Sequence, residues 1–265
     1  DSCHILAAGS IALLFIIYAL IPKSVTLSPP SAETAQIVTT TAITPAFTIV
    51  PTTTQTATVT PVPVPEINWL TEEIDIKEGV GVFSNLAMDN AGTQYVVYLD
   101  DKNDDLKMAS YDRTSWVTKT IVKNTTRDGW YPSMVFDQQN TMHIAYYAYD
   151  KHQIMYGNLM KSGFWNIIPA IRNVVVQDIS LVIGTDNVPQ LIYFDKDNQE
   201  IRYTRKNDSG WSTPVTVASG NAEGIYFPAV TDTKNQLHLV YLSDSGGLWY
   251  VKYENNKWTA PEPID

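Results

Sequence analysis

The sequence predicts an all-β fold of repeated four-stranded units, because two residue types recur at a nearly constant spacing. The first is tryptophan, whose successive positions differ by 47, 49, 46 and 47 residues: Trp69, Trp116, Trp165, Trp211 and Trp258. The second is tyrosine, at intervals of 48, 47 and 48 residues: Tyr98, Tyr146, Tyr193 and Tyr241. A fixed period of about 40–50 residues is typical of chains that stack one supersecondary unit on the next.

This spacing divides the chain into four repeats, at about residues 79–123, 124–172, 173–218 and 219–265. Each repeat contains four short strand-like runs, and the second run ends in the tyrosine: Val96–Tyr98, Ile144–Tyr146, Leu191–Tyr193 and Leu239–Tyr241. Four strands in about 47 residues form one blade of a β-propeller. No repeat has helical periodicity, which excludes helical solenoids. A β-sandwich is the main alternative, but it does not explain the aligned tryptophans.

A tight turn is expected between the first and second strand of each blade. One position of this turn holds only Gly or Asn: Gly92, Asn140, Asn187 and Asn235. These two residue types tolerate a positive φ better than the others. Three residues earlier the sequence has Asp89, Asp137, Gly184 and Asp232, which are again turn residues.

The repeat as a whole can be written D-x-x-[GN]-x-x-[HYQ]-hydrophobic-x-Y, followed by an acidic turn and a tryptophan strand. This pattern resembles the sialidase-like or BNR-like propeller repeats of bacterial surface proteins and covers Glu66 to Asp265. The resemblance implies a β-propeller. The Asp-box S-x-D-x-G-x-T-W of true sialidase blades is absent, so the resemblance is specific for the fold and not for an activity.

The start of the repeat region suggests that more blades exist than the four whole ones. Residues 68–71 align with residues 210–213, the outermost strand of a blade, yet the three inner strands of that first blade do not appear. We expect the native polypeptide to continue past Asp265, to six or seven blades.

The N-terminal region predicts a membrane anchor and a stalk. Ile5 to Ile21 carries no charge, and its 17 residues reach about 25 Å as a helix, enough for a thin bilayer. We therefore expect a transmembrane anchor in residues 1–23. A cleavable signal peptide is less favoured because it lacks a basic start and an A-x-A site. Acylation of Cys3, a buried core helix and a filament core are further alternatives.

Residues 24–65 are dominated by Thr, Pro, Ala and Val, which predicts an extended linker. Thr/Pro tracts of this kind are typical of stalks outside the cytoplasm. We therefore expect a single-pass membrane protein with its propeller on the extracytoplasmic side, at the cell surface or in the periplasm.

Charge and histidine content limit the classes of partner. The chain has 18 Lys and Arg against 28 Asp and Glu, a formal charge of −10, which argues against nucleic acid as a partner. His143 and His238 share a repeat column with Tyr95 and Gln190, so we interpret them as framework residues. No histidine pair has metal-ligand spacing, and we expect neither a metal nor another cofactor.

A candidate ligand surface combines acids and aromatics at one end of the blades. The acids follow the second strand of each blade, and the aromatics lie in the loops that lead into the blades: Asp100, Asp150, Asp195 and Asp244, with Phe83, Trp130, Tyr131, Tyr226 and Phe227. Such a set suits a sugar, although aromatics also plug propeller channels. The run Asp100–Asp105 offers oxygens to Ca²⁺ but lacks the D-x-D-x-D-G form, so a solvated turn is the simpler interpretation.

Catalysis is not indicated, because no carboxylate pair is singled out and no nucleophile or phosphate motif occurs. We therefore expect a non-catalytic, membrane-anchored, extracytoplasmic β-propeller that acts as an accessory or scaffolding subunit of a larger membrane or surface assembly. Its expected partners are other proteins, the membrane through residues 5–21, and a glycan. The alternatives are a carbohydrate-binding surface module, a sialidase-like glycoside hydrolase and a pilin-like filament subunit.

Overall fold

The computed structural model describes residues 71–123, 127–219, 227–243 and 246–264. The chain divides into two units, Asp1–Glu72 and Glu73–Asp265, and the fold below is that of the second. The expected anchor at residues 5–21, the linker and Trp69 lie outside the described residues. Within the described ranges, no helix is long and apolar enough to cross a bilayer.

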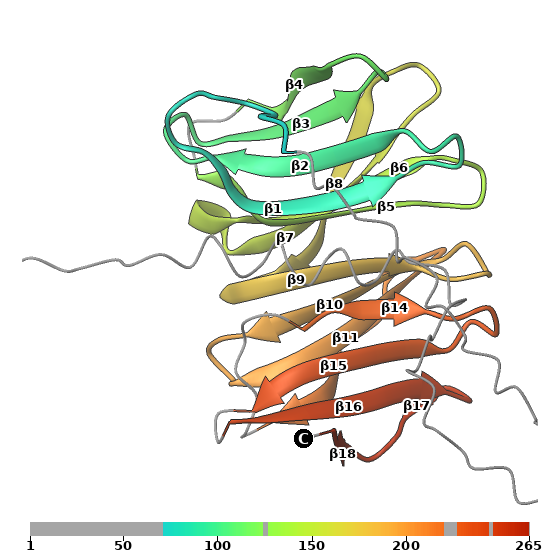
Figure 1. Ribbon diagram of the computed structural model, residues 1–265. Helices are drawn as coiled ribbons and strands as arrows, with labels where there is room; N and C mark the ends of the chain where they lie inside the picture. The colour runs from blue at the N-terminus through green and yellow to red at the C-terminus, as the bar shows by residue number, and fades with distance from the viewer. Residues whose placement is uncertain (1–70, 124–126, 220–226, 244–245, 265) are drawn as a thin grey trace, which may run out of the picture. The chain divides into compact units, whose positions relative to one another are not determined.

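The first two blades are regular four-stranded antiparallel sheets (Figure 1). Blade 1 consists of β1 (Val80–Met88), β2 (Gln94–Asp100), β3 (Asp105–Tyr111) and β4 (Trp116–Val122). Blade 2 consists of β5 (Asp128–Phe136), β6 (Met142–Ala148), β7 (Gln153–Leu159) and β8 (Trp165–Arg172), with the short 3₁₀ turn η2 (Tyr149–Lys151) between β6 and β7.

The last two blades have an outermost strand in two pieces. Blade 3 consists of β9 (Val176–Ile183), β10 (Pro189–Asp195), β11 (Glu200–Asn207), β12 (Gly210–Trp211) and β13 (Val215–Ser219). Blade 4 consists of β14 (Ala229–Thr231), β15 (Leu237–Ser243), β16 (Gly247–Glu254), β17 (Lys257–Trp258) and β18 (Glu262–Pro263). Pro214 and Pro261 lie in the two interruptions, where a residue without an N–H group cannot join the ladder.

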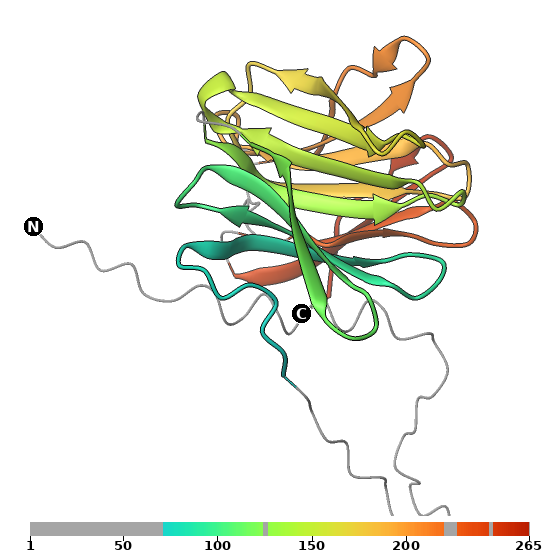
Figure 2. The ribbon, with the colours of Figure 1, turned by 90° about the horizontal axis from the view of Figure 1, so that it is seen from above.

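Successive blades meet along their first strands. Strand β1 contacts β5, β5 contacts β9, and β9 contacts β14. Figures 1 and 2 show the sheets following one another in chain order, from β1–β4 to β14–β18. The all-β prediction with four-stranded repeats is confirmed, and first strands side by side are the arrangement of a propeller.

The predicted turn column has a positive φ in all four blades. Its φ angles are 80° at Gly92, 62° at Asn140 and Asn187, and 63° at Asn235. In each turn the backbone N–H of this residue donates to the carbonyl oxygen three residues earlier, at 3.0 Å. The left-handed backbone therefore explains why only Gly and Asn occupy this position.

The tryptophans lie on the outermost strands, as the repeat predicts, and two of them reach across a blade boundary. Trp211 of blade 3 packs on Tyr156 of blade 2, with 5.2 Å between the ring centres. Trp258 of blade 4 packs on Tyr203 of blade 3 at 5.4 Å. Trp211 and Trp258 thus each make a contact between neighbouring blades, whereas Trp116 packs on Tyr111 of its own blade.

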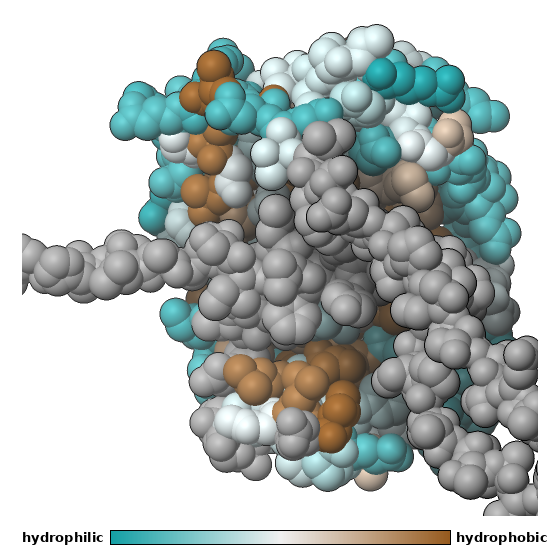
Figure 3. Space-filling model, in the orientation of Figure 1, coloured by the Kyte–Doolittle hydropathy of each residue, from teal (hydrophilic) through white to brown (hydrophobic). Residues whose placement is uncertain are grey.

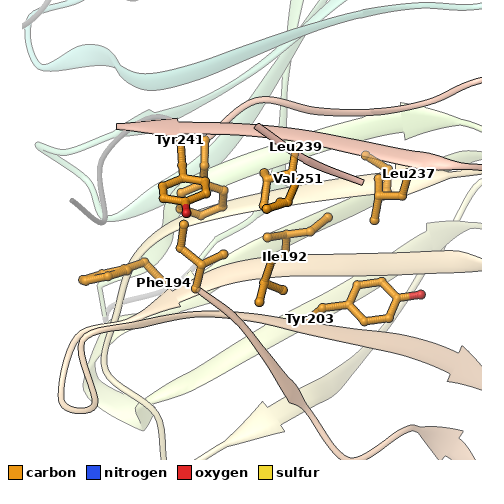
Figure 4. Packing of buried hydrophobic residues seen from close by; sticks show 11 residues of the cluster. Ile192, Phe194, Tyr203, Leu237, Leu239, Tyr241 and Val251 are labelled. Atoms are coloured by element: carbon orange, nitrogen blue, oxygen red, sulfur yellow. The ribbon is translucent and has the colours of Figure 1, made fainter. Parts of the chain in front are cut away.

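Three hydrophobic clusters form the core, and each is shared by two consecutive blades. Figure 4 shows the cluster between blades 3 and 4, in which Ile192, Phe194 and Tyr203 face residues of β15 and β16. Because successive side chains of a strand point to opposite faces, blades 2 and 3 each pack on the preceding blade with one face and on the following blade with the other.

Candidate functional site

One end of the blades carries most of the predicted site residues. The start of β1 pairs with the end of β2 (Val80 with Asp100), and the start of β9 pairs with the end of β10 (Val176 with Asp195). The segments that lead into these blades therefore lie at the same end as the hairpins between second and third strands. We name this end the loop face.

Two aromatic residues on the loop face lie in matching β-bulges. The register shifts between Val82 and Asn85 in β1, and between Trp130 and Ser133 in β5. Phe83 has a φ of 50° and Tyr131 a φ of 51°. A bulge redirects a side chain, and a left-handed backbone at a bulky residue costs about 1–3 kcal/mol. Strain of this kind is typical of functional positions.

These bulges bring together an aromatic cluster of four residues: Phe83, Trp130, Tyr131 and Tyr149. The ring centre of Phe83 lies 4.5 Å from that of Tyr131 and 5.4 Å from that of Trp130. Trp130 lies 5.5 Å from Tyr149 of η2. Phe83 is 38% exposed, and the other three rings are half-buried. The cluster thus offers aromatic surface to a ligand.

A charged pair borders the aromatic cluster. The guanidinium of Arg127 lies over the ring of Tyr149, 4.0 Å from its centre, and donates two hydrogen bonds of 2.9 and 3.0 Å to the carboxylate of Asp150. Both charged side chains are about half exposed. Burial, with a smaller contribution from the negative charge of Asp178, raises the pKa of Tyr131 to about 12, so its hydroxyl keeps its proton and can donate.

Two of the predicted acids are buried within their own hairpins. Asp100 accepts a hydrogen bond from the amide of Asn103 and lies 3.3 Å from the ammonium of Lys107. Asp195 is only 5% exposed and lies 3.4 Å from the Nε atom of Arg202. The prediction that these two carboxylates lie open to a ligand is not met, because each stabilises the hairpin that follows it.

In blade 2 the buried carboxylate that pairs with a cation comes from a different position of the repeat. Ala148 occupies the position of Asp100 and Asp195, and its partner across the sheet, Asp128, supplies the carboxylate. Lys151 lies 2.6 Å from that carboxylate. This leaves Asp150, one residue further along, on the surface beside the aromatic cluster.

Asp75 extends this pattern of engaged carboxylates and was not predicted. Its carboxylate accepts hydrogen bonds from the hydroxyl of Tyr98 (2.9 Å) and the ammonium of Lys107 (3.1 Å). Although burial acts in the opposite direction, these hydrogen bonds hold the pKa of Asp75 below its ordinary value. Asp75 precedes the first blade and belongs to no repeat column, so no signal in the sequence singled it out.

The remaining predicted residues have different positions. Phe227 is 2% exposed and packs in the core between blades 3 and 4, so it does not line a surface. Tyr226 and Asp244 lie outside the described residues. The structure therefore brings together Phe83, Trp130, Tyr131 and Asp150 from the predicted set. Tyr149 and Arg127 complete the site, and sequence reasoning missed both.

His143 and His238 belong to the framework. His143 lies 2.6 Å from the hydroxyl of Tyr156 and 3.2 Å from the carboxylate of Asp137. His238 lies 2.7 Å from the hydroxyl of Tyr250 in the same way. Among the residues that the structure describes, no group of three His, Cys, Asp or Glu side chains is placed to hold a metal ion, and this includes the Asp100–Asp105 hairpin.

A cavity of about 330 Å³ lies at the boundary of blades 3 and 4 and had no signal in the sequence. Its walls are formed by β13, by Tyr241 and Ser243 of β15, by Trp249 of β16 and by Pro261. It is lined by none of the residues of the aromatic cluster of blades 1 and 2.

Comparisons with known proteins identify the fold. No family model matches the chain, and no curated protein matches it. In structure it is similar to SapL1 lectin in complex with α-methyl fucoside, with 11% identity over 68% of this chain and 63% of that one and a TM-score of 0.55. It is similar to the Hadza microbial sialidase Hz136, with 14% identity over 68% and 46% of the two chains and a TM-score of 0.51.

A lectin from Aleuria aurantia, in complex with α-methyl-L-fucoside, is also similar: 16% identity, 69% of this chain, 60% of that one and a TM-score of 0.50. The chain thus spans between 46% and 63% of the length of these three proteins. At such low identity the likeness shows the fold alone. The described part of this chain has the β-propeller fold of lectins and sialidases.

Proposed function

We propose that this chain is a non-catalytic β-propeller that binds carbohydrate on its aromatic cluster. The observation that carries the proposal is the pair of strained bulges that hold Phe83 and Tyr131 against Trp130 while leaving part of their rings exposed. The C–H face of a sugar ring is apolar and stacks on such rings. The neighbouring Arg127 and Asp150 can form charge-assisted hydrogen bonds with sugar hydroxyls.

The state of the nearby carboxylates supports binding without hydrolysis. A glycosidase needs a carboxylic acid whose pKa is raised, beside a second carboxylate. On the loop face, Asp100, Asp128 and Asp195 each lie against a cation within their own blade. The pKa of Asp75 is shifted downwards, in the direction opposite to that of a general acid.

An oligosaccharide array followed by calorimetry tests this proposal. The wild-type chain should bind at least one class of glycan, and Trp130→Ala and Phe83→Ala should each weaken binding by about tenfold or more, the loss of about 1.4 kcal/mol. Phe164→Ala is the matched control, because Phe164 is an exposed aromatic on another hairpin. Hydrolysis of fluorogenic glycosides by the wild-type chain would point to the glycosidase alternative.

A second candidate function is the accessory or scaffolding subunit. The hairpin between β7 and β8 lies at the end opposite the loop face and exposes 42% of Met160 and 72% of Phe164. Exposed large apolar side chains at a loop tip suit contact with another protein. If this role holds, Phe164→Ser should abolish a cross-link from this hairpin to a subunit that co-purifies with the native protein, and Phe83→Ala should not.

The membrane topology of the chain is a further part of the proposal. We infer a single-pass protein anchored through residues 5–21, with residues 24–65 as a stalk and the propeller on the extracytoplasmic side. The pilin-like alternative depends on the same N-terminal residues. Protease added to intact cells should release the propeller if this topology is correct, whereas a propeller that is cut only after lysis would contradict it.

A further inference from the structure

Two cationic side chains lie beside the aromatic cluster, and each is already paired with a carboxylate. The guanidinium of Arg127 lies over the ring of Tyr149 and donates to Asp150. The ammonium of Lys151, the last residue of η2, lies 2.6 Å from the carboxylate of Asp128. In Figure 3, hydrophobic side chains over the start of β1 are likewise bordered by hydrophilic ones. The charges at this surface therefore help to decide which ligand the rings can accept.

The pair formed by Arg127 and Asp150 uses only one oxygen of the carboxylate. The Nε and Nη2 atoms of Arg127 both donate to Oδ1 of Asp150, at 3.0 and 2.9 Å. This edge of a guanidinium is one that can bind a ligand carboxylate with two parallel hydrogen bonds, and here it is filled. Among the described residues, none donates a hydrogen bond to Oδ2 of Asp150. Since the side chain is 43% exposed, Oδ2 can accept a hydroxyl group of a ligand.

The ion pair is particular to blade 2, although the backbone around it is shared with blades 1 and 3. In these three blades, the hairpin after the second strand donates a backbone N–H to a carbonyl oxygen of the segment that leads into the blade: Asp101 to Gly79 at 2.9 Å, Tyr149 to Arg127 at 3.1 Å, and Lys196 to Val175 at 2.9 Å. Glycine or valine at the position of Arg127 cannot form an ion pair. The junction thus forms without the pair, so the pair is not a requirement of the fold.

Further carboxylates make the surroundings of the aromatic cluster negative. The hydrogen bonds to Asp150 raise the pKa of Arg127, and the negative charge of Asp104 adds to that rise. The charge of Asp178 acts on Tyr131 in the same sense, behind the larger effect of burial. Among the described residues that act on the cluster, carboxylates therefore outnumber cations. An anion that approaches the cluster meets repulsion.

We infer that Asp150 determines the charge of the ligand: it suits the aromatic cluster to uncharged glycans and excludes glycans that carry a carboxylate or a sulfate group there. The inference rests on the proposed carbohydrate site. A sugar hydroxyl can donate to Oδ2 of Asp150, and the free N–H groups of Arg127 can donate to a neighbouring oxygen of the same sugar. A carboxylate or sulfate has no proton to offer Oδ2 and would have to displace Asp150 from Arg127.

The test compares one glycan in two charge states. The best glycan from the array that has a primary hydroxyl group is measured by calorimetry at pH 7.5, beside the same glycan with that hydroxyl oxidised to a carboxylate. We expect the wild-type chain to bind the neutral form about tenfold or more tightly than the oxidised form. Asp150→Ala, which leaves the edge of Arg127 open, should reduce this preference by about tenfold, mainly through tighter binding of the oxidised glycan.

Two controls separate this effect from a change in net charge. Asp197 is exposed at the position of blade 3 that corresponds to Asp150, and Asp197→Ala should leave the preference unchanged. The double variant of Arg127→Gln with Asp150→Ala should lose the gain for the oxidised glycan, because no arginine is left to bind the new carboxylate.

The results distinguish this inference from the carbohydrate site itself. Equal or tighter binding of the oxidised glycan by the wild-type chain, weakened by Trp130→Ala, would overturn the inference and leave the site in place. A preference that Asp150→Ala does not change would have the same meaning. If neither form binds, or if Trp130→Ala does not weaken binding, the proposed site is wrong, and the inference is wrong with it.

Discussion

The asparagines of the turn column have two functions, of which the sequence revealed one. The positive φ could be predicted, because Asn alternates with Gly at this position. The second function requires the structure: the Asn187 side chain accepts the N–H of Gln138 in the preceding blade at 3.0 Å and also donates to Asp137 and Gln139. Each turn is thus hydrogen-bonded to the one before it.

Replacement of Asn187 separates these two contributions. Asn187→Gly keeps a residue that accepts the backbone angle but removes the bonds to blade 2, and should cost about 1–2 kcal/mol of unfolding free energy. Asn187→Ala also strains the backbone and should cost about 1 kcal/mol more. Urea denaturation measures both values. Equal stability of the glycine and alanine variants would show that the left-handed angle does not matter here.

Gly184 occupies the one turn where the aspartate column is broken, and the structure explains why. A Cβ atom at this position would overlap the amide of Asn235 in blade 4. Gly184→Ala should therefore displace that amide from its hydrogen bond to Asp186 and destabilise the chain by about 1 kcal/mol, the usual net worth of such a bond. The effect should shrink when Asn235→Gly is also present, and a double-mutant cycle measures this coupling. Strict additivity would contradict the explanation.

The candidate site could be predicted in part. Phe83, Trp130 and Tyr131 could be predicted because they lie in the segments that lead into blades 1 and 2. Tyr149 belongs to a 3₁₀ turn found in blade 2, and Arg127 reaches it by a stacking contact, so neither follows from a repeat column. Asp100 and Asp195 were correctly placed at the blade ends, but their burial depends on the cations of the next strand.

At the scale of the strand and blade, the period of the sequence was sufficient to identify the second strand of each of the four blades. It did not identify the split outermost strands of blades 3 and 4, because the repeat was traced through tryptophan and tyrosine. Pro214 and Pro261 carried that information. The hydrophobic clusters of the core could be predicted only in part. Alternation along a strand indicates which residues share a face, but not which neighbouring blade covers that face.

His143 makes the stability of blade 2 pH-dependent. Burial lowers the pKa of His143, with Asp137 acting in the opposite direction and Lys206 adding to the lowering. An unfolded chain binds a proton at this histidine near pH 6.5, whereas the folded chain binds it only at lower pH. The stability that depends on neutral His143 is therefore complete above about pH 6.5 and declines as the pH falls below it.

His143→Gln tests this account with a residue that the fold already uses. Gln190 takes the same column in blade 3 and accepts a hydrogen bond of 2.7 Å from Tyr203. The wild-type chain should lose more unfolding free energy than His143→Gln between pH 7.5 and pH 5, measured by urea denaturation. Hydrogen bonds hold the pKa of Asp137 low in spite of its burial, so its own contribution is lost only in more acidic solution. Identical pH profiles would contradict the assignment.

At the scale of the whole molecule, fold and function are carried by different features. The repeat columns, the tryptophan ladder and the shared cores build a β-propeller, a scaffold that the similar lectins and the similar sialidase also have. Function on such a scaffold depends on side chains at particular ends of particular blades. In this chain we propose that those side chains are the bulged aromatics of blades 1 and 2. The membrane anchor in residues 5–21 likewise remains a prediction.

The most direct test of carbohydrate binding observes Trp130 itself. The chain is labelled with 5-fluorotryptophan, and its ¹⁹F NMR spectrum is followed during titration with the best glycan from the array, with resonances assigned by single Trp→Phe variants. We predict a saturable shift of the Trp130 resonance and an unchanged Trp258 resonance. A glycan that binds while Trp130 stays unperturbed, or that shifts Trp249 of the cavity between blades 3 and 4 instead, would contradict the assignment of the site.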